Sequence, residues 1–478
     1  MRKAKILATI GPVSRDPVIL EAMLAAGVDG VRINMSHGTH AEKAEDIRLA
    51  RAVAERMNRA LAVLVDLSGP KIRTRTLRNH QPVILKDNQQ FTITTREIEG
   101  DSTQVATNYP GMPRDVHVGA RVLLDDGAIE LRVESTTETD IVTRVINGGT
   151  LGERKGINLP GITLPIPSMT AKDRDDLKWA AQQDVDYFAL SFVRSGADCL
   201  EAKKLIESAG SRAPLIAKIE KAEAIDHLDE IIAAADGVMV ARGDLGVETS
   251  VELVPVYQKQ IIEQANEAGK LVITATQMLQ SMVASPRPTR AEATDVANAV
   301  WDGSDCLMLS GETATGQYPV AAVATMARII ETAETRNAQR SIISKLVGRQ
   351  SGRVSRALCE AAAFAADEMN SRIIAVFTES GLMASRLASL RPDQRVIALT
   401  STREVMNALS VVWGVESVIT QRSRSTEELL KIGEQTLLQA DLVEIGETIV
   451  IMAGRLSGLG LSSSVTLYTV EGDIHETV

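Results

Sequence analysis

Short apolar runs alternate with amphipathic helical stretches along most of the chain. In the first 70 residues, apolar runs at 6–10, 30–34 and 61–66 end at polar or turn residues, and helical patterns cover 17–26 and 40–58. Strands that are apolar along their whole length are typical of a parallel sheet covered on both faces. This part of the chain therefore predicts three strand–helix units of an α/β fold.

The pattern changes between residues 71 and 166, where short alternating runs are rich in Thr, Val, Gly and Asp. Thr92-Ile93-Thr94 and Val122-Leu123-Leu124 are two such runs. The pairs Asp126-Gly127 and Asn147-Gly148 are turn signals of β-hairpins. We therefore predict a small antiparallel β domain inserted into the α/β chain.

The strand–helix rhythm resumes after Pro167. Five further apolar runs are separated by helical stretches, the last of them near 319–335, and these runs lie at 186–192, 214–219, 236–241, 270–275 and 304–309. Three units before the insert and five after it make eight, which favours a (β/α)8 TIM barrel. A doubly wound open sheet would look similar strand by strand, so the pattern leaves that alternative open.

A charged stretch at 336–354 precedes a last part with four more apolar runs, at 373–377, 396–399, 415–419 and 448–452. This part predicts a separate α/β domain. The expected domains are a catalytic barrel at 1–70 and 167–336, an inserted β domain at 71–166 and a C-terminal α/β domain at 337–478.

Composition narrows the class of protein. The net charge is 52 − 62 = −10, which argues against a nucleic-acid surface along the whole chain, so an anionic substrate would need a locally basic pocket. Cys199, Cys306 and Cys359 are too few and too scattered for a disulfide framework or a CxxC metal site. The N-terminus has no apolar signal core, and no apolar stretch is long enough to span a membrane. We therefore expect a cytoplasmic protein without a membrane partner.

Polar residues cluster where the predicted barrel strands end, and a TIM barrel carries its chemistry at that end. Glu220 and Asp244 form a sparse oxygen site of the kind that suits Mg²⁺. Arg32, Arg73 and Lys218 are cations suited to phosphate. A metal with Lys and Arg around a phosphoryl group favours phosphoryl transfer. The chain has no P-loop and no HRD or DFG motif of protein kinases, so such an enzyme would use an unrelated fold.

The polar residues at the strand ends, which also include Thr276 and His37, each have an ordinary structural explanation. A single Arg or Lys at a strand end is usually a surface group, and Asp244 between glycines is a common turn former. Thr276 is a strand former, and His37 could cap the next helix, for which Thr39 is an equally good candidate. These explanations lose weight because the residues converge on one mouth of the predicted barrel.

Longer motifs carry a family resemblance. They are ATIGP (8–12), RINMSHG (32–38), KGINLPG (155–161), AKIEKAEAI (217–225), MVARGDLG (239–246), ATQML (275–279), SPRPTRAEATDVANAVWDG (285–303) and LSGETA (309–314). With these motifs the chain resembles the pyruvate kinase family along nearly its whole length. The resemblance implies a TIM barrel with an inserted small β-barrel lid and a C-terminal regulatory domain. It also implies transfer of phosphate from phosphoenolpyruvate to ADP, giving pyruvate and ATP, the last step of glycolysis.

The resemblance assigns roles to residues of the barrel. Arg32 binds the substrate phosphate, and Lys218 stabilises the phosphoryl group in flight. Gly243, Asp244 and Thr276 hold the substrate carboxylate, and Thr276 takes part in protonating the enolate carbon. Glu220 and Asp244 hold Mg²⁺ or Mn²⁺.

Four further positions match the nucleotide side of the family's site. They are Asn34, His37, Arg73 and Lys155. Lys155 comes from the inserted domain, so closure of that domain would bring its ammonium over the site and exclude water.

One departure concerns the bound K⁺ of many family members. Asn34, Ser36, Asp66 and Leu67 occupy the positions of that cation site, with Leu67 in place of a Thr, and Lys71 replaces a Glu. A fixed ammonium can supply the charge that K⁺ would bring. We therefore predict weak or no dependence on K⁺.

The resemblance also implies an allosteric homotetramer. Thr378, Ser380 and Gly381 resemble the family's phosphate-holding loop, with Gly454-Arg455 in a second loop nearby, so a sugar phosphate or a nucleotide is the expected effector. A plain strand-to-helix turn is the alternative.

Two other functions stay open at this point. Another Mg²⁺-dependent barrel acting on pyruvate or phosphoenolpyruvate, such as a lyase, would not need Arg73, Lys155 and a lid. A non-catalytic, effector-binding relative should have lost some of the five residues that it no longer uses, and all five are present: Arg32, Lys218, Glu220, Asp244 and Thr276.

Overall fold

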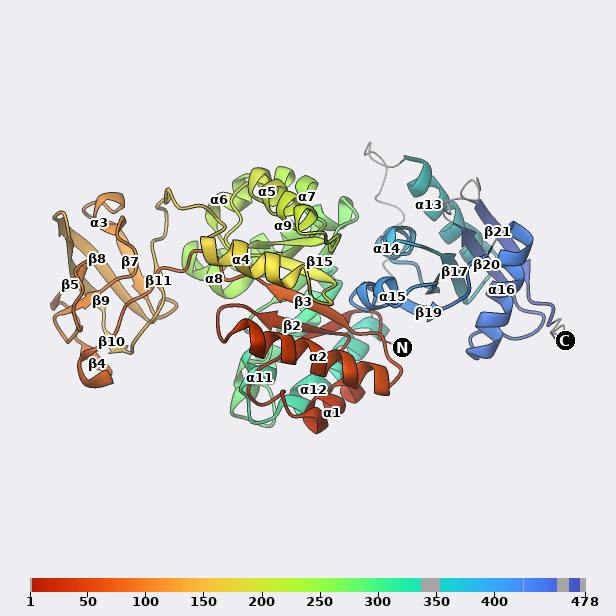
Figure 1. Cartoon of the computed structure of the whole chain (residues 1–478), viewed down its shortest axis with the longest axis horizontal. Coiled ribbons are helices and arrows are strands. Elements are labelled where there is room, and N and C mark those ends of the chain that lie inside the picture. Colours follow the sequence, from red (N-terminus) through yellow and green to blue (C-terminus); the bar gives the residue numbers. More distant parts are fainter. Residues whose placement is uncertain (1, 337–352, 424, 454–463, 473–478) are drawn as a thin grey trace.

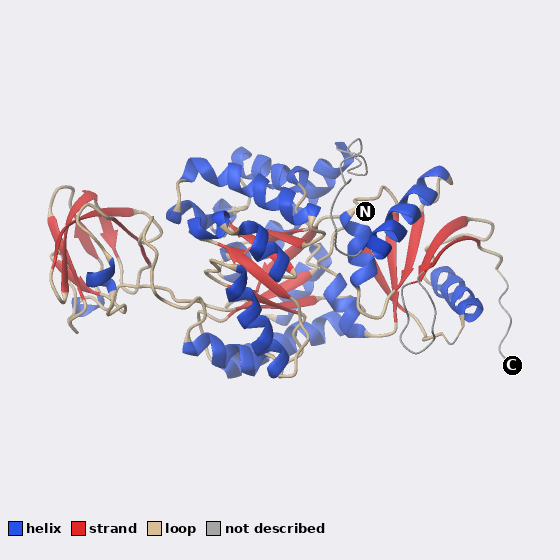
Figure 2. Cartoon of the chain, turned by 90° about the horizontal axis from the view of Figure 1, so that it is seen from above, coloured by secondary structure: helices blue, strands red, loops and turns tan. Residues whose placement is uncertain are grey.

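Three bodies follow one another along the molecule, with a barrel between an inserted β domain and a C-terminal α/β domain (Figure 1). The computed structural model describes residues 2–336, 353–423, 425–453 and 464–472. The chain leaves the barrel for the inserted domain after β3 and returns before α4, so two connecting segments join these bodies (Figure 2).

The central body is a closed barrel of eight parallel strands in the order β1-β16-β15-β14-β13-β12-β3-β2. The ring of pairs confirms the predicted TIM barrel and excludes the open sheet. Every strand lies within two residues of its predicted position. The strands are β1 (Lys5–Thr9), β2 (Gly30–Asn34), β3 (Ala62–Asp66), β12 (Tyr187–Leu190), β13 (Leu215–Ile219), β14 (Gly237–Ala241), β15 (Leu271–Ala275) and β16 (Cys306–Leu309).

Helices ring the barrel and bury its outer face (Figure 2). At α2 the Thr39 side chain accepts from the Glu42 amide and the Glu42 carboxylate accepts in return, so Thr39 is the cap and His37 is not. Among the described residues, no helix is long and apolar enough to cross a membrane. The helical elements are α1 (Pro17–Ala26), α2 (His40–Arg56), α4 (Ala171–Ala180), α5 (Gly196–Ser208), α6 (Ala222–Asp226), α7 (Leu228–Ala234), α8 (Arg242–Glu248), η2 (Val251–Leu253), α9 (Val254–Glu267), η3 (Gln280–Val283), α10 (Arg290–Asp302), α11 (Gly311–Ala314) and α12 (Pro319–Arg336).

The inserted domain is built on a six-stranded sheet, β11-β7-β8-β9-β5-β6, and a two-stranded sheet, β10-β4. All its strand pairs are antiparallel except β5 with β6. Its core is centred on the fully buried Phe91. The elements are η1 (Arg78–His80), β4 (Val83–Leu85), β5 (Gln90–Thr94), β6 (Gln104–Ala106), α3 (Met112–Asp115), β7 (Arg121–Leu124), β8 (Ile129–Thr136), β9 (Asp140–Asn147), β10 (Gly149–Leu151) and β11 (Ile157–Asn158).

The two predicted hairpin turns have different outcomes. Asp126-Gly127 joins β7 to β8, which pair with each other, so this hairpin is confirmed. The hairpin at Asn147-Gly148 is wrong, because β9 leads into β10, which pairs with β4 instead. Gly148 is required there by close approach, since a Cβ would lie 2.2 Å from the Leu85 carbonyl oxygen.

The C-terminal domain is a five-stranded sheet in the order β19-β18-β17-β20-β21. Sequence reasoning missed β21, an antiparallel edge strand that is only partly buried. The elements are α13 (Arg353–Glu368), β17 (Ile373–Phe377), α14 (Leu382–Ser389), β18 (Arg395–Thr400), α15 (Arg403–Leu409), β19 (Val415–Ile419), α16 (Thr426–Gln439), β20 (Thr448–Ala453) and β21 (Ser464–Thr469).

The segment after α15 closes the amino end of the barrel. Val411 is 2% exposed and packs with the apolar side chains of the barrel interior. Beside it, the Ser410 hydroxyl donates to the Asp29 carbonyl at 2.7 Å, and Tyr187 donates to the Ala408 carbonyl at 2.7 Å. The C-terminal domain thus supplies part of the barrel core.

Candidate active site

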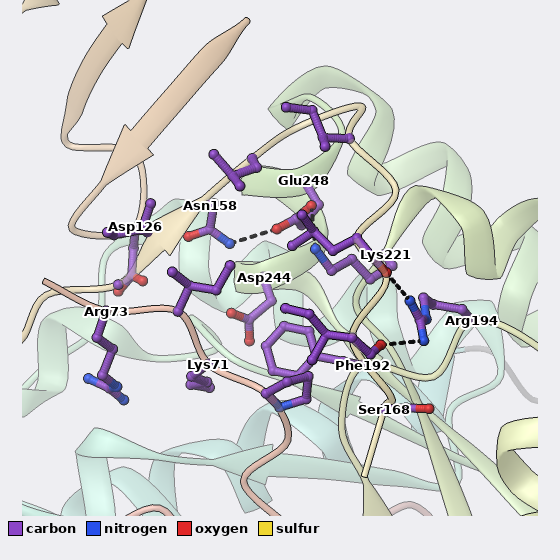
Figure 3. Close-up of a pocket in the computed structure, with 18 of the residues that line it drawn as sticks. Lys71, Arg73, Asp126, Asn158, Ser168, Phe192, Arg194, Lys221, Asp244 and Glu248 are labelled. Atoms are coloured by element: carbon purple, nitrogen blue, oxygen red, sulfur yellow. Dashed lines mark hydrogen bonds and ion pairs between the residues drawn. The ribbon is translucent and has the colours of Figure 1, made fainter. Parts of the chain in front are cut away.

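A cavity of about 240 Å³ lies between the carboxyl ends of the barrel strands and the inserted domain. Lys71 and Arg73 approach it from the segment after β3, Asp126 and Asn158 from the insert, and Asp244 from α8 (Figure 3). The carboxyl ends of parallel strands meet at this edge, which is why residues from distant parts of the sequence converge here.

Lys218 lies at the centre of the buried charges. It is on β13, and its ammonium nitrogen lies 3.2 Å from Asp66 Oδ1 and 2.8 Å from Glu220 Oε1. It also donates to the Ser191 hydroxyl at 2.7 Å. Burial alone would lower the pKa of Lys218, but the charges on Asp66 and Glu220 outweigh it and raise the pKa above its ordinary value. Lys218 is therefore a permanent positive charge.

Asp66 joins Lys218 to a second, half-buried cation, Arg32. Arg32 lies on the neighbouring strand β2, and its Nε donates to Asp66 Oδ2 at 2.7 Å. Arg32 NH1 also donates to the Thr9 hydroxyl at 3.3 Å. Burial would raise the pKa of Asp66, yet Lys218 and Arg32 together lower it. The carboxylate thus holds both cations at the mouth of the barrel.

Glu220 and Asp244, the predicted metal ligands, lie close enough for their charges to interact. Glu220 is fully buried, and its Oε2 accepts from the Phe192 amide at 2.8 Å. Its Oε1 faces Lys218 but accepts no hydrogen bond with good geometry. Burial raises the pKa of Glu220, and the charge on Asp244 acts in the same direction. A divalent cation between the two carboxylates would remove that repulsion, so the donor set fits Mg²⁺.

This donor set is sparse. In the parts of the chain that the structure describes, no group of three or more His, Cys, Asp or Glu side chains could hold a metal ion. Glu220 and Asp244 are two carboxylates, so the remaining ligands must come from substrate oxygens and water, as Mg²⁺ sites commonly arrange.

Thr276 and Gly243 are joined across the ends of β15 and β14. The Gly243 amide donates to Thr276 Oγ1 at 2.8 Å, and that hydroxyl donates to the Ala275 carbonyl at 2.6 Å. The residues predicted to hold a carboxylate therefore form one connected unit. The explanation of Asp244 as a simple turn former is wrong, because Asp244 lies in the first turn of helix α8, which begins at Arg242.

Of the four predicted nucleotide-side residues, Arg73 and Lys155 line the cavity. Lys155 pairs with Asp125 of its own domain at 2.9 Å, and Arg73 NH1 donates to the Arg154 carbonyl at 3.0 Å. Partial desolvation and the charges of Arg73 and Lys43 lower the pKa of His37, so its imidazole is neutral near pH 7.

Asn34 and Ser36, two of the predicted K⁺-site positions, have polar side chains, whereas Leu67, a third, has an apolar one. Asn34 Oδ1 accepts from the Ser36 amide at 3.0 Å, and both side chains are half-buried near the site. Leu67 contributes only backbone there, since its side chain belongs to the apolar core and its carbonyl accepts from Ser191 at 2.6 Å. The Lys71 ammonium lies 5.9 Å from the centre of the Phe192 ring.

Comparison with known proteins identifies the family. A family model described as the barrel domain of pyruvate kinase matches residues 1–323, and one described as the alpha/beta domain of pyruvate kinase matches residues 356–465. The chain belongs to the pyruvate kinase family.

Individual relatives agree. A pyruvate kinase of Sporosarcina psychrophila is 41% identical over 477 residues, which cover 99% of this chain and 81% of that protein. One of Geobacillus stearothermophilus is 42% identical over 456 residues, covering 95% and 78%. The crystal structure of a pyruvate kinase from Cryptosporidium parvum aligns with a TM-score of 0.90 at 36% identity and covers 98% of this chain and 96% of that one.

Several residues in or near this cavity were not predicted from the sequence. Asn158 Nδ2 of the insert donates to Glu248 Oε1 of α8 at 2.8 Å, and Lys221 pairs with the other oxygen of Glu248 at 2.9 Å (Figure 3). Ser191 ends the fourth barrel strand, so the strand-end rule could have found it. Arg194 holds the returning connection through the carbonyls of 164 and 166, at 2.8 and 2.7 Å, and no sequence pattern marks such a contact.

The predicted effector loop lies in the C-terminal domain, far along the chain from this site. Thr378 Oγ1 accepts from the Gly381 amide at 2.9 Å, and Ser380 is exposed. Gly381 is left-handed and precedes α14. The second predicted loop, Gly454-Arg455, lies outside the described residues.

Proposed function

We propose that the chain transfers the phosphoryl group of phosphoenolpyruvate to ADP and releases pyruvate and ATP, the last step of glycolysis. The proposal is supported by two groups at the carboxyl ends of the barrel strands. Arg32, Lys218 and Glu220 form one ion-paired group through Asp66, and Thr276 bonds Gly243 next to Asp244, which lines the cavity. Membership of the pyruvate kinase family makes the chain a phosphotransferase. The lyase and the non-catalytic relative are not favoured by it.

Glu220 and Asp244 would hold the divalent ion, Mg²⁺ or Mn²⁺. When bound, such an ion neutralises charge on the transferring phosphoryl group and on the oxygen of the leaving enolate. The burial of Glu220 beside the Asp244 charge, a repulsion that a divalent ion would offset, supports this assignment.

Arg32 and Lys218 bind and orient the phosphoryl group. A terminal oxygen of ADP attacks phosphorus, the bond from phosphorus to the enol oxygen breaks, and the enolate of pyruvate leaves. Charge spreads over the equatorial oxygens during this step, and a guanidinium and an ammonium fixed by Asp66 stabilise it without reorganisation. Lys218 acts as a charge and not as an acid, because its neighbours raise its pKa.

Thr276, Gly243 and Asp244 hold the substrate carboxylate and orient the enolate. Its methylene carbon then takes a proton through water and the Thr276 hydroxyl to give pyruvate. The Thr276 hydroxyl already exchanges hydrogen bonds with Gly243 and Ala275, so it can pass a proton without moving far.

The nucleotide binds on the side of Asn34, His37, Arg73 and Lys155. The inserted domain closes over it as a lid and keeps water from the phosphoryl group. The Asn158–Glu248 hydrogen bond supports this role, since it ties the insert to the barrel.

Lys71 replaces K⁺ in this site. Its ammonium lies beside Phe192, and its charge opposes the burial that raises the pKa of Glu220. Asn34, Ser36 and Asp66 then support the surrounding side chains in place of a cation, and Leu67 adds only backbone.

Regulation and assembly complete the proposal. Thr378, Ser380 and Gly381 bind the phosphate of a sugar-phosphate or nucleotide effector. The protein is a cytoplasmic homotetramer. Contact between copies is supported by exposed apolar side chains, at Val251, Val256, Trp301 and Phe364.

One assay tests the reaction. Pyruvate formation from phosphoenolpyruvate is followed with and without ADP, Mg²⁺ and K⁺, and pyruvate with ATP is expected only when ADP and Mg²⁺ are both present. Absence of pyruvate under every combination would overturn the assignment, and pyruvate formed without ADP would favour the lyase. Size-exclusion chromatography with light scattering tests the tetramer.

A further inference from the structure

The chain after β15 takes a strained path at the edge of the active site. Thr276 has φ 69° and Gln277 has φ 55°, so two consecutive residues other than glycine lie in the left-handed region. Among the described residues, Thr276 is the one β-branched side chain with positive φ. Such a residue is rare there because its branched Cβ crowds the backbone, and the conformation persists only when surrounding contacts impose it.

Arg242 makes a contact that holds Thr276 in this left-handed conformation. Its NH2 donates to the Thr276 carbonyl at 2.8 Å, which fixes the direction of the peptide between Thr276 and Gln277. Arg242 is the first residue of α8 and directly precedes Gly243. It is only 8% exposed, so the hydrogen bond is shielded from water.

The guanidinium is itself held from the other side. Its NH1 donates to Asp295 Oδ1 of α10 at 2.7 Å and to Gln258 Oε1 of α9 at 3.3 Å. Gln258 is fixed in turn, because its amide donates to Asp302 at 2.8 Å. Arg242 thus bridges two outer helices to one peptide at the barrel mouth.

The contact is reciprocal. The Arg242 side chain reaches the backbone of Thr276, and the Thr276 side chain accepts from the backbone amide of Gly243 at 2.8 Å. The two hydrogen bonds close a ring between the ends of β14 and β15. If the Thr276 peptide turned, the hydroxyl would leave both Gly243 and Ala275.

We propose that Arg242 is a positioning residue that places the Thr276 hydroxyl against the substrate carboxylate and the enolate carbon. The inference rests on the proposed function and deepens it. It assigns Arg242 to the phosphoenolpyruvate side of the site, so its loss affects that substrate and the protonation step and leaves ADP binding unchanged. A purely structural Arg would affect stability and both substrates alike.

The test compares three variants of the full chain. Arg242→Lys keeps the charge but loses the fork that reaches the carbonyl and Asp295 together. Asp295→Ala releases the anchor and leaves Arg242 in place. Arg51→Lys is the matched control, since Arg51 is also largely buried and binds the Leu61 carbonyl and Asp186, but at the amino ends of the strands.

For Arg242→Lys we expect kcat/KM for phosphoenolpyruvate to fall by about 100-fold, with KM for ADP unchanged, because misplacement by about 1 Å costs that much. Exchange of the pyruvate methyl protons into D₂O, followed by NMR, should slow in parallel. Asp295→Ala should shift the same quantities in the same direction by a smaller factor. Arg51→Lys should lower the melting temperature and leave all the kinetic values unchanged.

A folded Arg242→Lys protein with wild-type KM for phosphoenolpyruvate and wild-type proton exchange would overturn the inference. Equal rises in KM for both substrates would also overturn it. If Arg242→Lys does not melt cooperatively, Asp295→Ala decides, since Asp295 is 37% exposed and Arg242 keeps its hydrogen bonds to Gln258 and Thr276. Failure of the proposed function would be seen differently, because the wild-type protein itself would then make no pyruvate.

Discussion

The Lys218 ammonium lies 3.2 Å from Asp66 Oδ1, and this ion pair spans β12, which separates their strands in the barrel. Asp66 therefore fixes a charge on a strand that is not its neighbour. Because the pair is buried and Lys218 stays protonated, its positive charge is available to the phosphoryl group at every pH of interest.

Replacing Lys218 by Met should lower kcat by roughly 10³-fold, since one preorganised charge is lost from the transition state. The fold should persist, as an apolar side chain of similar length fills the space. Steady-state kinetics with a circular dichroism melt measures both. Near-normal turnover in a folded variant would remove the role assigned to Lys218.

Chelation with EDTA should abolish turnover, and Mg²⁺ or Mn²⁺ should restore it. In Glu220→Gln the Mg²⁺ concentration for half-maximal activity should rise at least roughly tenfold, because a charged ligand is lost. Glu223→Gln is the control, since Glu223 lines the same cavity but is not assigned to the metal. A metal titration that is the same in both variants and the wild type would contradict the assignment.

The wild-type protein should be nearly as active in Na⁺ as in K⁺, and Lys71→Glu should make activity depend on K⁺ by removing the fixed ammonium. Initial rates in the two salts at equal ionic strength measure this. Lys221→Met is the control, because Lys221 lies 5.7 Å from the same Phe192 ring but pairs with Glu248. A wild-type rate that is negligible without K⁺ and rises by about tenfold or more with it would refute the prediction.

Asn158→Ala should raise KM for ADP roughly tenfold, because a hydrogen bond to a carboxylate that ties the insert to the barrel is lost. KM for phosphoenolpyruvate should change less. Arg121→Ala breaks an exposed ion pair with Glu130 inside the insert and should leave both values unchanged. Equal effects of the two variants would show that the contact between the domains carries no special weight.

Asp186 should make stability depend on pH. Burial raises the pKa of Asp186 to about 6 in the folded state, against 3.8 when it is free, so the folded protein binds more protons between these values. Stability from this group is full below pH 4 and is lost as the pH rises through 6. Relative to Asp186→Asn, the wild-type protein should therefore lose roughly 3 kcal/mol of unfolding free energy between pH 4 and 7, measured by urea titration. A constant difference between the two proteins would contradict the raised pKa.

Much of the barrel was predictable because its strands are apolar throughout and end abruptly at polar residues. The sequence therefore indicates both that each element is a strand and where the strand ends. The main errors lie where long-range pairing overrides local pattern. Asn147-Gly148 has the sequence of a hairpin turn, yet the close approach of Leu85 decides its path. The edge strand β21 alternates too weakly to be recognised.

The site was predictable to a different degree. Residues at strand ends could be named because the barrel brings all strand ends together. The sequence did not point to Arg242, Asn158 or Glu248. Their roles depend on contacts between different elements, and the spacing of residues along the sequence does not predict such contacts. Asp66 was predicted as a position of the cation site, and its place between Arg32 and Lys218 comes from the register of the barrel.

Val411 sets a limit on how the molecule can be divided. A side chain from the C-terminal domain fills the floor of the barrel, so that domain and the catalytic body share one hydrophobic interior. Cutting the chain between them would leave an apolar opening under the active site. It follows that the two domains cannot gain or lose stability independently, and that a ligand held by one strengthens the other through ordinary packing.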